Sequence, residues 1–92
     1  MISPTAIIGN NVHIGPHVVI EDNVTIGNHV RIDAGTFIGK NTTINNDCNI
    51  NPNVSIYHDV TIGNHCIIDS GSVIGADGFS LVKDNNIHHK IY

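Results

Sequence analysis

The sequence predicts an all-β protein, a parallel β-helix built from six-residue repeats. Isoleucine occupies every sixth position from Ile2 to Ile74, thirteen times without an insertion. A fixed period of this kind indicates a repeat architecture, in which small structural units stack on their neighbours. A helical fold is excluded, because β-branched residues and glycine recur too often and at a spacing that no helical turn matches.

Each repeat is expected to form a short strand followed by a corner. A smaller residue lies two places before each isoleucine, and because side chains alternate along a strand, both residues face the core. Glycine and asparagine follow the isoleucine, and both tolerate the positive φ that a sharp corner demands. The smaller core residues are Ala6, Val12, Val18, Val24, Val30, Thr36, Thr42, Cys48, Val54, Val60, Cys66 and Ser72; the expected corner residues are Gly9, Gly15, Gly27, Gly39, Gly63, Gly75, Asn10, Asn28, Asn46 and Asn64.

This repeat resembles that of the hexapeptide acyltransferase superfamily, whose fold is a left-handed β-helix. The resemblance implies that three repeats close one triangular coil, so that residues 18 apart stack on adjacent coils. Residues 1–79 then form the β-helix domain, with a little over four coils. The period stops after Ile74, and the "KDNN" stretch is typical of a turn. Residues 80–92 are therefore expected to be an irregular loop or tail that leaves the helix.

The composition excludes several classes of protein. The 92 residues carry a formal charge of −4 with only four Lys and Arg, which argues against a surface for nucleic acid or an anionic membrane. No apolar run could span a membrane and no secretion signal is recognisable, so we expect a cytoplasmic protein. Cys48 and Cys66 should stack about 4.8 Å apart, slightly wide for a relaxed disulfide, and are expected to be buried thiols.

Stacking by 18 sorts the outward residues into three faces, one of which carries a mostly apolar stripe. An isolated β-helix in water has no reason to expose such a stripe. Superfamily members are typically homotrimers packed side by side along a face of this kind. We therefore expect the stripe to be part of a trimer contact, the alternative being scattered surface apolar residues. The stripe consists of Val19, Phe37, Ser55 and Val73.

The other two faces carry weaker signals. A threonine ladder occupies the second face, which resembles ice-binding β-helices in part, but only one column is threonine and the preference of threonine for exposed strands explains it. The third face is mixed in character and indicates no function. The ladder consists of Thr25, Thr43 and Thr61, and the third face of His13, Arg31, Asn49 and Ile67.

The chain has seven histidines, which raises the question of a metal site. His29 and His65 lie in one corner column, two coils or about 9.5 Å apart, with Asp47 between them. Because a zinc ligand must lie near 2.0–2.2 Å from the ion, the two histidines cannot share one zinc. We expect a hydrogen-bonded His–Asp–His ladder with no metal and no cofactor, the alternative being a zinc site shared between subunits.

His58, which precedes Asp59 at a corner, is the candidate general base. The rest of its column supplies no nucleophile and no oxyanion donor, so no complete catalytic constellation can be assembled from spacing. A structural corner or the wall of a substrate cleft are the alternatives for this histidine.

The stretch "NVSIYHDVTIGNHCIIDSGSVIGADGFS" resembles the UDP-3-O-(3-hydroxyacyl)glucosamine N-acyltransferases of lipid A biosynthesis, most specifically from Tyr57 to Phe79. The resemblance implies transfer of a 3-hydroxyacyl chain from acyl carrier protein to the amine of a UDP-glucosamine derivative. It also implies direct attack by the amine with a histidine as base, in clefts between the subunits of a homotrimer. Loops that leave a rigid scaffold often carry function, so Asp77, Gly78 and Phe79 are the candidate substrate-binding residues.

The chain departs from that family in two respects. Family members have a uridine-binding domain before the β-helix, whereas here Met1 leads directly into the first repeat. Their catalytic histidine lies in an "AHN" repeat of later coils, which has no counterpart here. The chain thus corresponds to about the first half of the family's β-helix and is expected to be inactive alone, as a truncated form, a split gene product or a minimal β-helix. A structural scaffold without catalysis, or another hexapeptide transferase, is the alternative.

Overall fold

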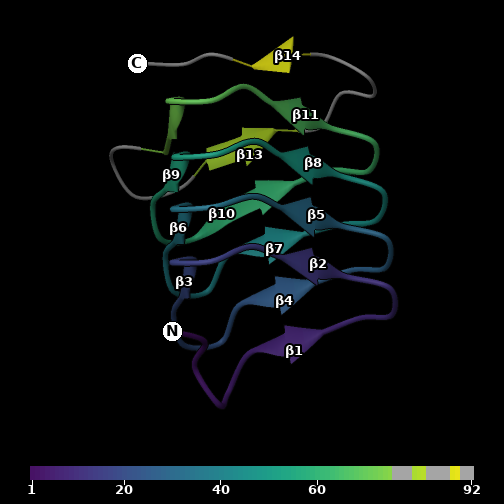
Figure 1. Ribbon diagram of the computed structural model, residues 1–92, viewed down its shortest axis with the longest axis vertical. Coiled ribbons are helices and arrows are strands. Elements are labelled where there is room, and N and C mark those ends of the chain that lie inside the picture. The colour runs from purple at the N-terminus through teal and green to yellow at the C-terminus, as the bar shows by residue number, and fades with distance from the viewer. Residues whose placement is uncertain (76–79, 83–87, 90–92) are drawn as a thin grey trace.

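The computed structural model describes residues 1–75, 80–82 and 88–89. All of its regular elements are short strands, which form three parallel sheets around one axis (Figure 1). The first sheet has the order β1-β4-β7-β10-β13, the second β2-β5-β8-β11-β14 and the third β3-β6-β9-β12. The strands are β1 (Ile7–Ile8), β2 (His13–Ile14), β3 (Val19–Ile20), β4 (Thr25–Ile26), β5 (Arg31–Ile32), β6 (Phe37–Ile38), β7 (Thr43–Ile44), β8 (Asn49–Ile50), β9 (Ser55–Ile56), β10 (Val60–Ile62), β11 (Ile67–Ile68), β12 (Val73–Ile74), β13 (Ser80–Val82) and β14 (His88–His89).

The register of these sheets confirms the predicted fold. From β1 to β12 each residue pairs with the residue 18 places further along, as in Ile7 with Thr25 and Val19 with Phe37. Three repeats therefore close one coil, and consecutive strands lie in different sheets. The protein is an all-β, left-handed parallel β-helix of hexapeptide repeats, with about four coils. None of the described residues forms a helix that is long and apolar enough to cross a membrane.

Two strands lie within the segment that the sequence predicts to be an irregular loop or tail. Strand β13 pairs with β10, with Ser80 opposite Val60, and β14 pairs with β11, with His88 opposite Ile67. The offset in these two pairs is larger than 18 residues, so the chain contributes to two sheets without keeping the six-residue period. The domain boundary after residue 79 stays a prediction, because residues 76–79, 83–87 and 90–92 lie outside the described part.

The core consists of the two inward columns that the sequence predicts. Every isoleucine of the period from Ile20 to Ile74 is at most 1% exposed, and the smaller residues from Val18 to Ser72 are also buried. Ile2 and Ile8 are 44% and 36% exposed, since no described coil lies beneath them. Burial of a full isoleucine side chain contributes about 1.5–3 kcal/mol, so this column is the main stabilising element of the fold.

The corners differ from the sequence prediction. Positive φ occurs mainly at the third residue after each isoleucine, for example at Asn11 (57°) and His29 (57°), and not at the residues that directly follow the isoleucine. Of the predicted corner glycines only Gly75 has a positive φ. Gly9, Gly15, Gly27 and Gly39 are instead needed for close approach: a Cβ on Gly39 would lie 2.6 Å from the backbone carbon of Tyr57 in the next coil. The prediction of positive φ for the glycine and asparagine columns was therefore wrong for most positions.

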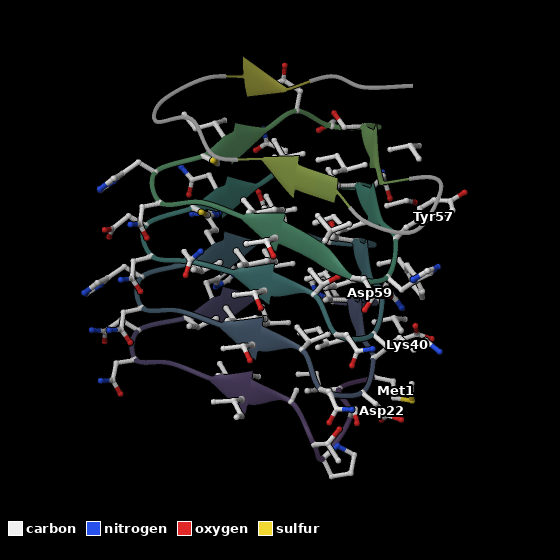
Figure 2. All side chains as sticks on the ribbon, turned by 180° about the vertical axis from the view of Figure 1, so that it is seen from behind. Met1, Asp22, Lys40, Tyr57 and Asp59 are labelled. Atoms are coloured by element: carbon white, nitrogen blue, oxygen red, sulfur yellow. The ribbon has the colours of Figure 1, made fainter. Side chains whose placement is uncertain are left out.

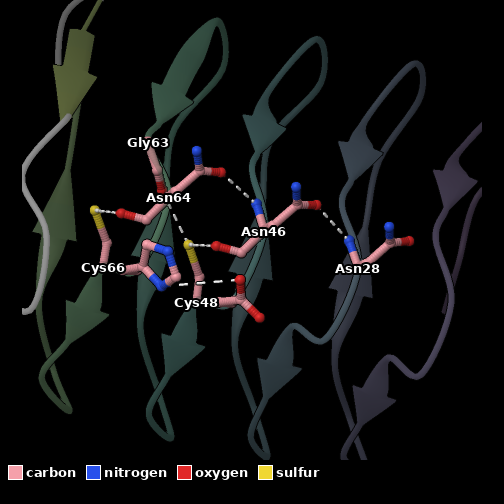
Figure 3. A network of polar contacts seen from close by, with 8 residues as sticks. Asn28, Asn46, Cys48, Gly63, Asn64 and Cys66 are labelled. Carbon is pink, nitrogen blue, oxygen red and sulfur yellow. Dashed lines mark hydrogen bonds and ion pairs between the residues drawn. The ribbon is translucent and has the colours of Figure 1, made fainter.

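The asparagine column links consecutive coils through the backbone. The Oδ1 atom of Asn28 accepts a hydrogen bond from the backbone N–H of Asn10 at 2.8 Å, and Asn46 and Asn64 accept in the same way from Asn28 and Asn46 (Figure 3). The sequence predicts corner geometry and stacking of side-chain amides for this column; the contacts instead join a side chain to a backbone. Each bond satisfies a corner N–H that strand pairing leaves free.

Candidate functional site

The strongest cluster of chemically active side chains lies at the corner between the third sheet and the first. Four stacked loops form it, at residues 3–5, 21–23, 39–41 and 57–59, which we call the charged corner. Figure 2 shows Asp22, Met1, Lys40, Asp59 and Tyr57 along this edge of the β-helix, from bottom to top. Since consecutive coils repeat the same backbone path, side chains at equivalent positions are stacked at about the strand spacing.

His58 and Asp59 form a hydrogen-bonded pair at the upper end of the described charged corner. The Nδ1 atom of His58 lies 2.7 Å from Oδ2 of Asp59, and both side chains are 45% exposed. This hydrogen bond lowers the pKa of Asp59, and a hydrogen bond from Asn41 and the charge of Lys40 act in the same direction. Asp59 is therefore ionised at neutral pH and accepts the Nδ1 proton. In the neutral imidazole this leaves Nε2 with its lone pair free to take a proton, as a general base requires.

The backbone beneath this pair is held by hydrogen bonds to the coils on both sides. The N–H of Tyr57 donates to the carbonyl of Ile74 at 2.9 Å, and the N–H of Asp59 donates to the carbonyl of Lys40 at 2.9 Å. The hydroxyl of Thr42, which lies in the core, donates to the carbonyl of Tyr57 at 2.9 Å. A functional side chain mounted on so constrained a backbone keeps its position at little entropic cost.

Two other core residues of the same coil as Thr42 also donate a hydrogen bond from the side chain to a backbone carbonyl of the next coil. Thr36 donates to the carbonyl of Asn51 at 3.0 Å, and the thiol of Cys48 donates to that of Gly63 at 3.0 Å (Figure 3). In each case the donor reaches the residue after the isoleucine in the next coil. One coil therefore carries a buried donor beneath each of its three corners, which is why polar residues interrupt a column that is otherwise mostly valine.

Replacing Thr42 by valine keeps the shape of the side chain but removes this hydrogen bond. We expect Thr42→Val to lower the free energy of unfolding by about 1–3 kcal/mol, because the carbonyl of Tyr57 loses a buried donor. Urea denaturation followed by circular dichroism measures the change. Thr42→Ser, which keeps the hydroxyl and loses one methyl, is the control and should cost about 1 kcal/mol. A valine variant as stable as the wild type would contradict the role given to the hydroxyl.

A hollow of about 220 Å³ lies lower on the charged corner, lined by Met1, Ser3, Glu21, Asp22 and Lys40. Asp22 accepts a hydrogen bond from the Ser3 hydroxyl at 2.5 Å, and Glu21 accepts one from the backbone N–H of Lys40 at 3.3 Å. Typical ligand pockets have volumes of about 300–1,000 Å³. The hollow therefore has room for part of a ligand, on a surface rich in carboxylates.

The predicted apolar stripe is continuous and borders the charged corner. Its four residues occupy β3, β6, β9 and β12 in direct register. Phe37 is 37% exposed, and Val19, Ser55 and Val73 are half-buried. Strand β9 ends at Ile56, one residue before Tyr57, so the stripe and the His58–Asp59 pair meet at one edge. The role of the stripe as a subunit interface stays a prediction.

The remaining candidate residues lie elsewhere. His65 Nδ1 is 3.8 Å from Asp47 Oδ2, so one step of the expected His–Asp–His ladder is present as a long contact. Among the described residues no three His, Cys, Asp or Glu side chains lie close enough together to hold a metal ion. Cys48 and Cys66 are buried thiols, as predicted, and burial raises the pKa of the Cys48 thiol to about 11.

Three predicted site residues cannot be compared with the structure, and one exposed residue at the site was not predicted. Asp77, Gly78 and Phe79, the candidate substrate-binding residues, lie outside the described residues. Tyr57, which sequence reasoning did not single out, is 40% exposed beside His58. One signal could have identified it, because Tyr57 occupies a repeat position at which the coils on either side, at Gly39 and Gly75, have glycine.

Comparison with known protein families agrees with the architecture. Residues 5–40 and 41–76 each match the family described as bacterial transferase hexapeptide (six repeats). No curated protein is similar enough to the chain for a significant match. The two matched stretches cover most of the chain and coincide with the coils of the β-helix. The chain therefore belongs to the bacterial transferase hexapeptide family.

Proposed function

We propose that the chain is part of an acyltransferase in which His58, oriented by Asp59, acts as the general base. The observation that carries the proposal is the 2.7 Å hydrogen bond from His58 to an ionised Asp59 at the edge of the apolar stripe. A nucleophile or base held by a third group is the usual arrangement of acyl-transfer sites. The transferase family of the chain and the resemblance of residues 57–79 to lipid A N-acyltransferases support the same reaction class.

The proposed substrates are a 3-hydroxyacyl thioester of acyl carrier protein and the amine of a UDP-glucosamine derivative, both in the cytoplasm. The amine attacks the thioester carbonyl, and Nε2 of His58 takes the proton that the amine loses. The C–S bond then breaks, and the leaving thiolate of the carrier takes this proton from His58 to leave as the thiol. Asp59 stabilises the imidazolium that forms, as a carboxylate next to a catalytic histidine does in other acyl-transfer enzymes. Backbone N–H groups hold the oxyanion of the intermediate.

The reaction is proposed to take place in clefts of a homotrimer, with the apolar stripe as part of the contact. A subunit packed on this face would place its surface next to the charged corner, because strand β9, which carries Ser55 of the stripe, ends one residue before Tyr57. Such packing would exclude water from one side of His58 and strengthen its interaction with Asp59. The apolar stripe would lose its exposure to water at the same time.

Phe37→Asp tests the interface. We expect this variant to elute as a single chain where the wild type elutes as three, because a carboxylate buried at the contact costs several kcal/mol. Light scattering after size exclusion measures the mass. Thr25→Asp, an equally exposed strand position on the first sheet, is the matched control and should leave the mass unchanged. Equal masses for Phe37→Asp and the wild type would remove the stripe from the interface.

The function itself is tested by acyl transfer. Purified protein is incubated with the 3-hydroxyacyl carrier thioester and the UDP-glucosamine derivative, and the amide product is followed by mass spectrometry. Product formation that requires both substrates supports the proposal. The second candidate is a structural β-helix without catalysis, which the uninterrupted isoleucine core favours. A folded trimer that forms no product and binds neither substrate would favour this second candidate.

A further inference from the structure

Tyr57 is an exposed large side chain that neither the open first coil nor the apolar stripe explains. Among the described residues the other large apolar side chains with such exposure are Met1, Ile2, Ile7 and Ile8 in the first coil and Phe37 on the stripe. We propose that the ring of Tyr57 is a platform on which the pyranose ring of an amino sugar stacks, with its amine directed to His58. This inference rests on the proposed function, to which it adds a specificity-determining residue.

The ring is mounted on a rigid part of the corner. The N–H of Tyr57 donates a hydrogen bond to the carbonyl of Ile74 in the coil above. The carbonyl of Tyr57 accepts a hydrogen bond from the hydroxyl of Thr42, which lies in the core. The backbone of Gly39 in the coil below lies so close that a Cβ there would be 2.6 Å from the backbone carbon of Tyr57. With the backbone held on both sides, a tyrosine has only two side-chain angles left to order, which makes it an inexpensive anchor for a ligand.

Among the described residues, the repeat positions equivalent to Tyr57 in the coils on either side have no side chain that could stack on its ring. These positions are Gly39 below and Gly75 above. The Tyr57 side chain projects outward from the edge of the β-helix (Figure 2). A flat apolar surface with a hydroxyl at its tip suits a pyranose ring, which has an apolar C–H face and hydroxyl groups at its rim.

The charges at this corner favour an amino sugar over a neutral sugar. The charged corner carries the carboxylates of Glu21, Asp22 and Asp59 beside the ammonium of Lys40, and the N-terminal ammonium of Met1, which lines the hollow below, donates to the carbonyl of Val18. A protonated amine gains from the carboxylates, whereas a neutral hydroxyl at the same place does not. His58 follows Tyr57 directly, so a sugar stacked on the ring would have its amine within reach of the imidazole that is to accept the proton.

Tyrosine fluorescence provides a direct test of binding. The chain has two tyrosines and no tryptophan, so Tyr57 is the sole emitter in a Tyr92→Phe background. Titration with glucosamine is expected to change this emission in a saturable way, glucose should bind several-fold more weakly, and UDP should have no effect. An emission that responds to UDP and not to glucosamine, or to neither, would overturn the proposal.

Variants of Tyr57 test the platform, with calorimetry of glucosamine binding as the readout. Tyr57→Phe keeps the ring and should bind within about twofold of the wild type, whereas Tyr57→Ala should bind about tenfold more weakly, as loss of an aromatic contact predicts. Ile7→Ala, which removes another exposed apolar side chain, is the control and should bind normally. Tyr57→Ala that binds glucosamine normally but has a smaller assembly mass would make Tyr57 a subunit contact and overturn the proposal.

Binding and acyl transfer are measured independently, which separates this inference from the proposed function. Glucosamine binding that depends on Tyr57 in a protein that forms no amide product supports the platform and refutes acyl transfer by this chain alone. Amide formation with an unchanged KM for the amino sugar in Tyr57→Ala supports the transferase and refutes the platform.

Discussion

The His58→Ala variant is expected to lose acyl transfer by a factor of about 10²–10⁴, the usual contribution of a general base. The physical reason is that the amine must lose a proton as it attacks, and no other described side chain at the charged corner combines a free basic nitrogen with a carboxylate partner. The measurement is kcat for amide formation with both substrates at saturation. Because proton removal occurs in the transition state, the loss should appear in kcat and not in KM.

His65→Ala is the matched control for this variant. His65 is also exposed at a corner and also lies next to an aspartate, but its Nδ1 is 3.8 Å from Asp47 and it belongs to a different edge of the β-helix. Its removal should leave kcat within twofold of the wild type. Asp59→Asn should give a smaller loss than His58→Ala, because it keeps the shape of the partner but removes the charge that stabilises the imidazolium. Equal activity of His58→Ala and wild type would exclude His58 as the base.

The Gly39→Ala variant is expected to lose about 3 kcal/mol or more of the free energy of unfolding. An added Cβ would lie 2.6 Å from the backbone carbon and 2.7 Å from the nitrogen of the next coil, at Tyr57 and His58. Backbone atoms cannot turn aside as the end of a side chain can, so two stacked coils must separate locally and lose hydrogen bonds. Urea denaturation followed by circular dichroism measures this loss.

Gly71→Ala is the control that distinguishes a glycine required for positive φ from one required for close approach between coils. Gly71 has a φ of 76°, and a Cβ placed there meets no atom of the described residues within 4 Å. The expected cost is only that of a left-handed conformation with a side chain, about 1–2 kcal/mol. If both variants lose the same free energy, the spacing between coils is not what requires glycine at position 39.

The core could be predicted from the sequence because every repeat shows the same pattern, so that many copies support one prediction. Each coil has the same inward residues, and the structure places the isoleucines from Ile20 to Ile74 at no more than 1% exposure. The apolar stripe was found for the same reason, since a spacing of 18 residues translates directly into neighbours in a sheet. A pattern that repeats many times specifies contacts between residues far apart in the chain.

The corners and the site could not be predicted to the same depth. The sequence does not distinguish a glycine needed for positive φ from one needed for close approach, and the structure assigns Gly39 to the second class and Gly71 to the first. Positive φ at histidine, as at His17 (61°), was not predicted from the repeat, although histidine is one of the non-glycine residues that adopt it most often. Residues with no repeat to support them, such as Tyr57, have only their own identity as evidence.

The amino-acid sequence alone determined the period, the inward columns and the stacking of residues 18 apart, because hydrophobic burial and strand alternation act on every repeat in the same way. Only the tertiary structure showed that Nδ1 of His58 is bonded to Asp59, that Thr42 anchors the carbonyl of Tyr57 from the core, and that a glycine lies against the backbone beneath it. These contacts depend on atomic distances between adjacent residues and adjacent coils. Hydrogen bonds and steric overlap change over a few tenths of an ångström, and residue identity and spacing carry no information at that scale.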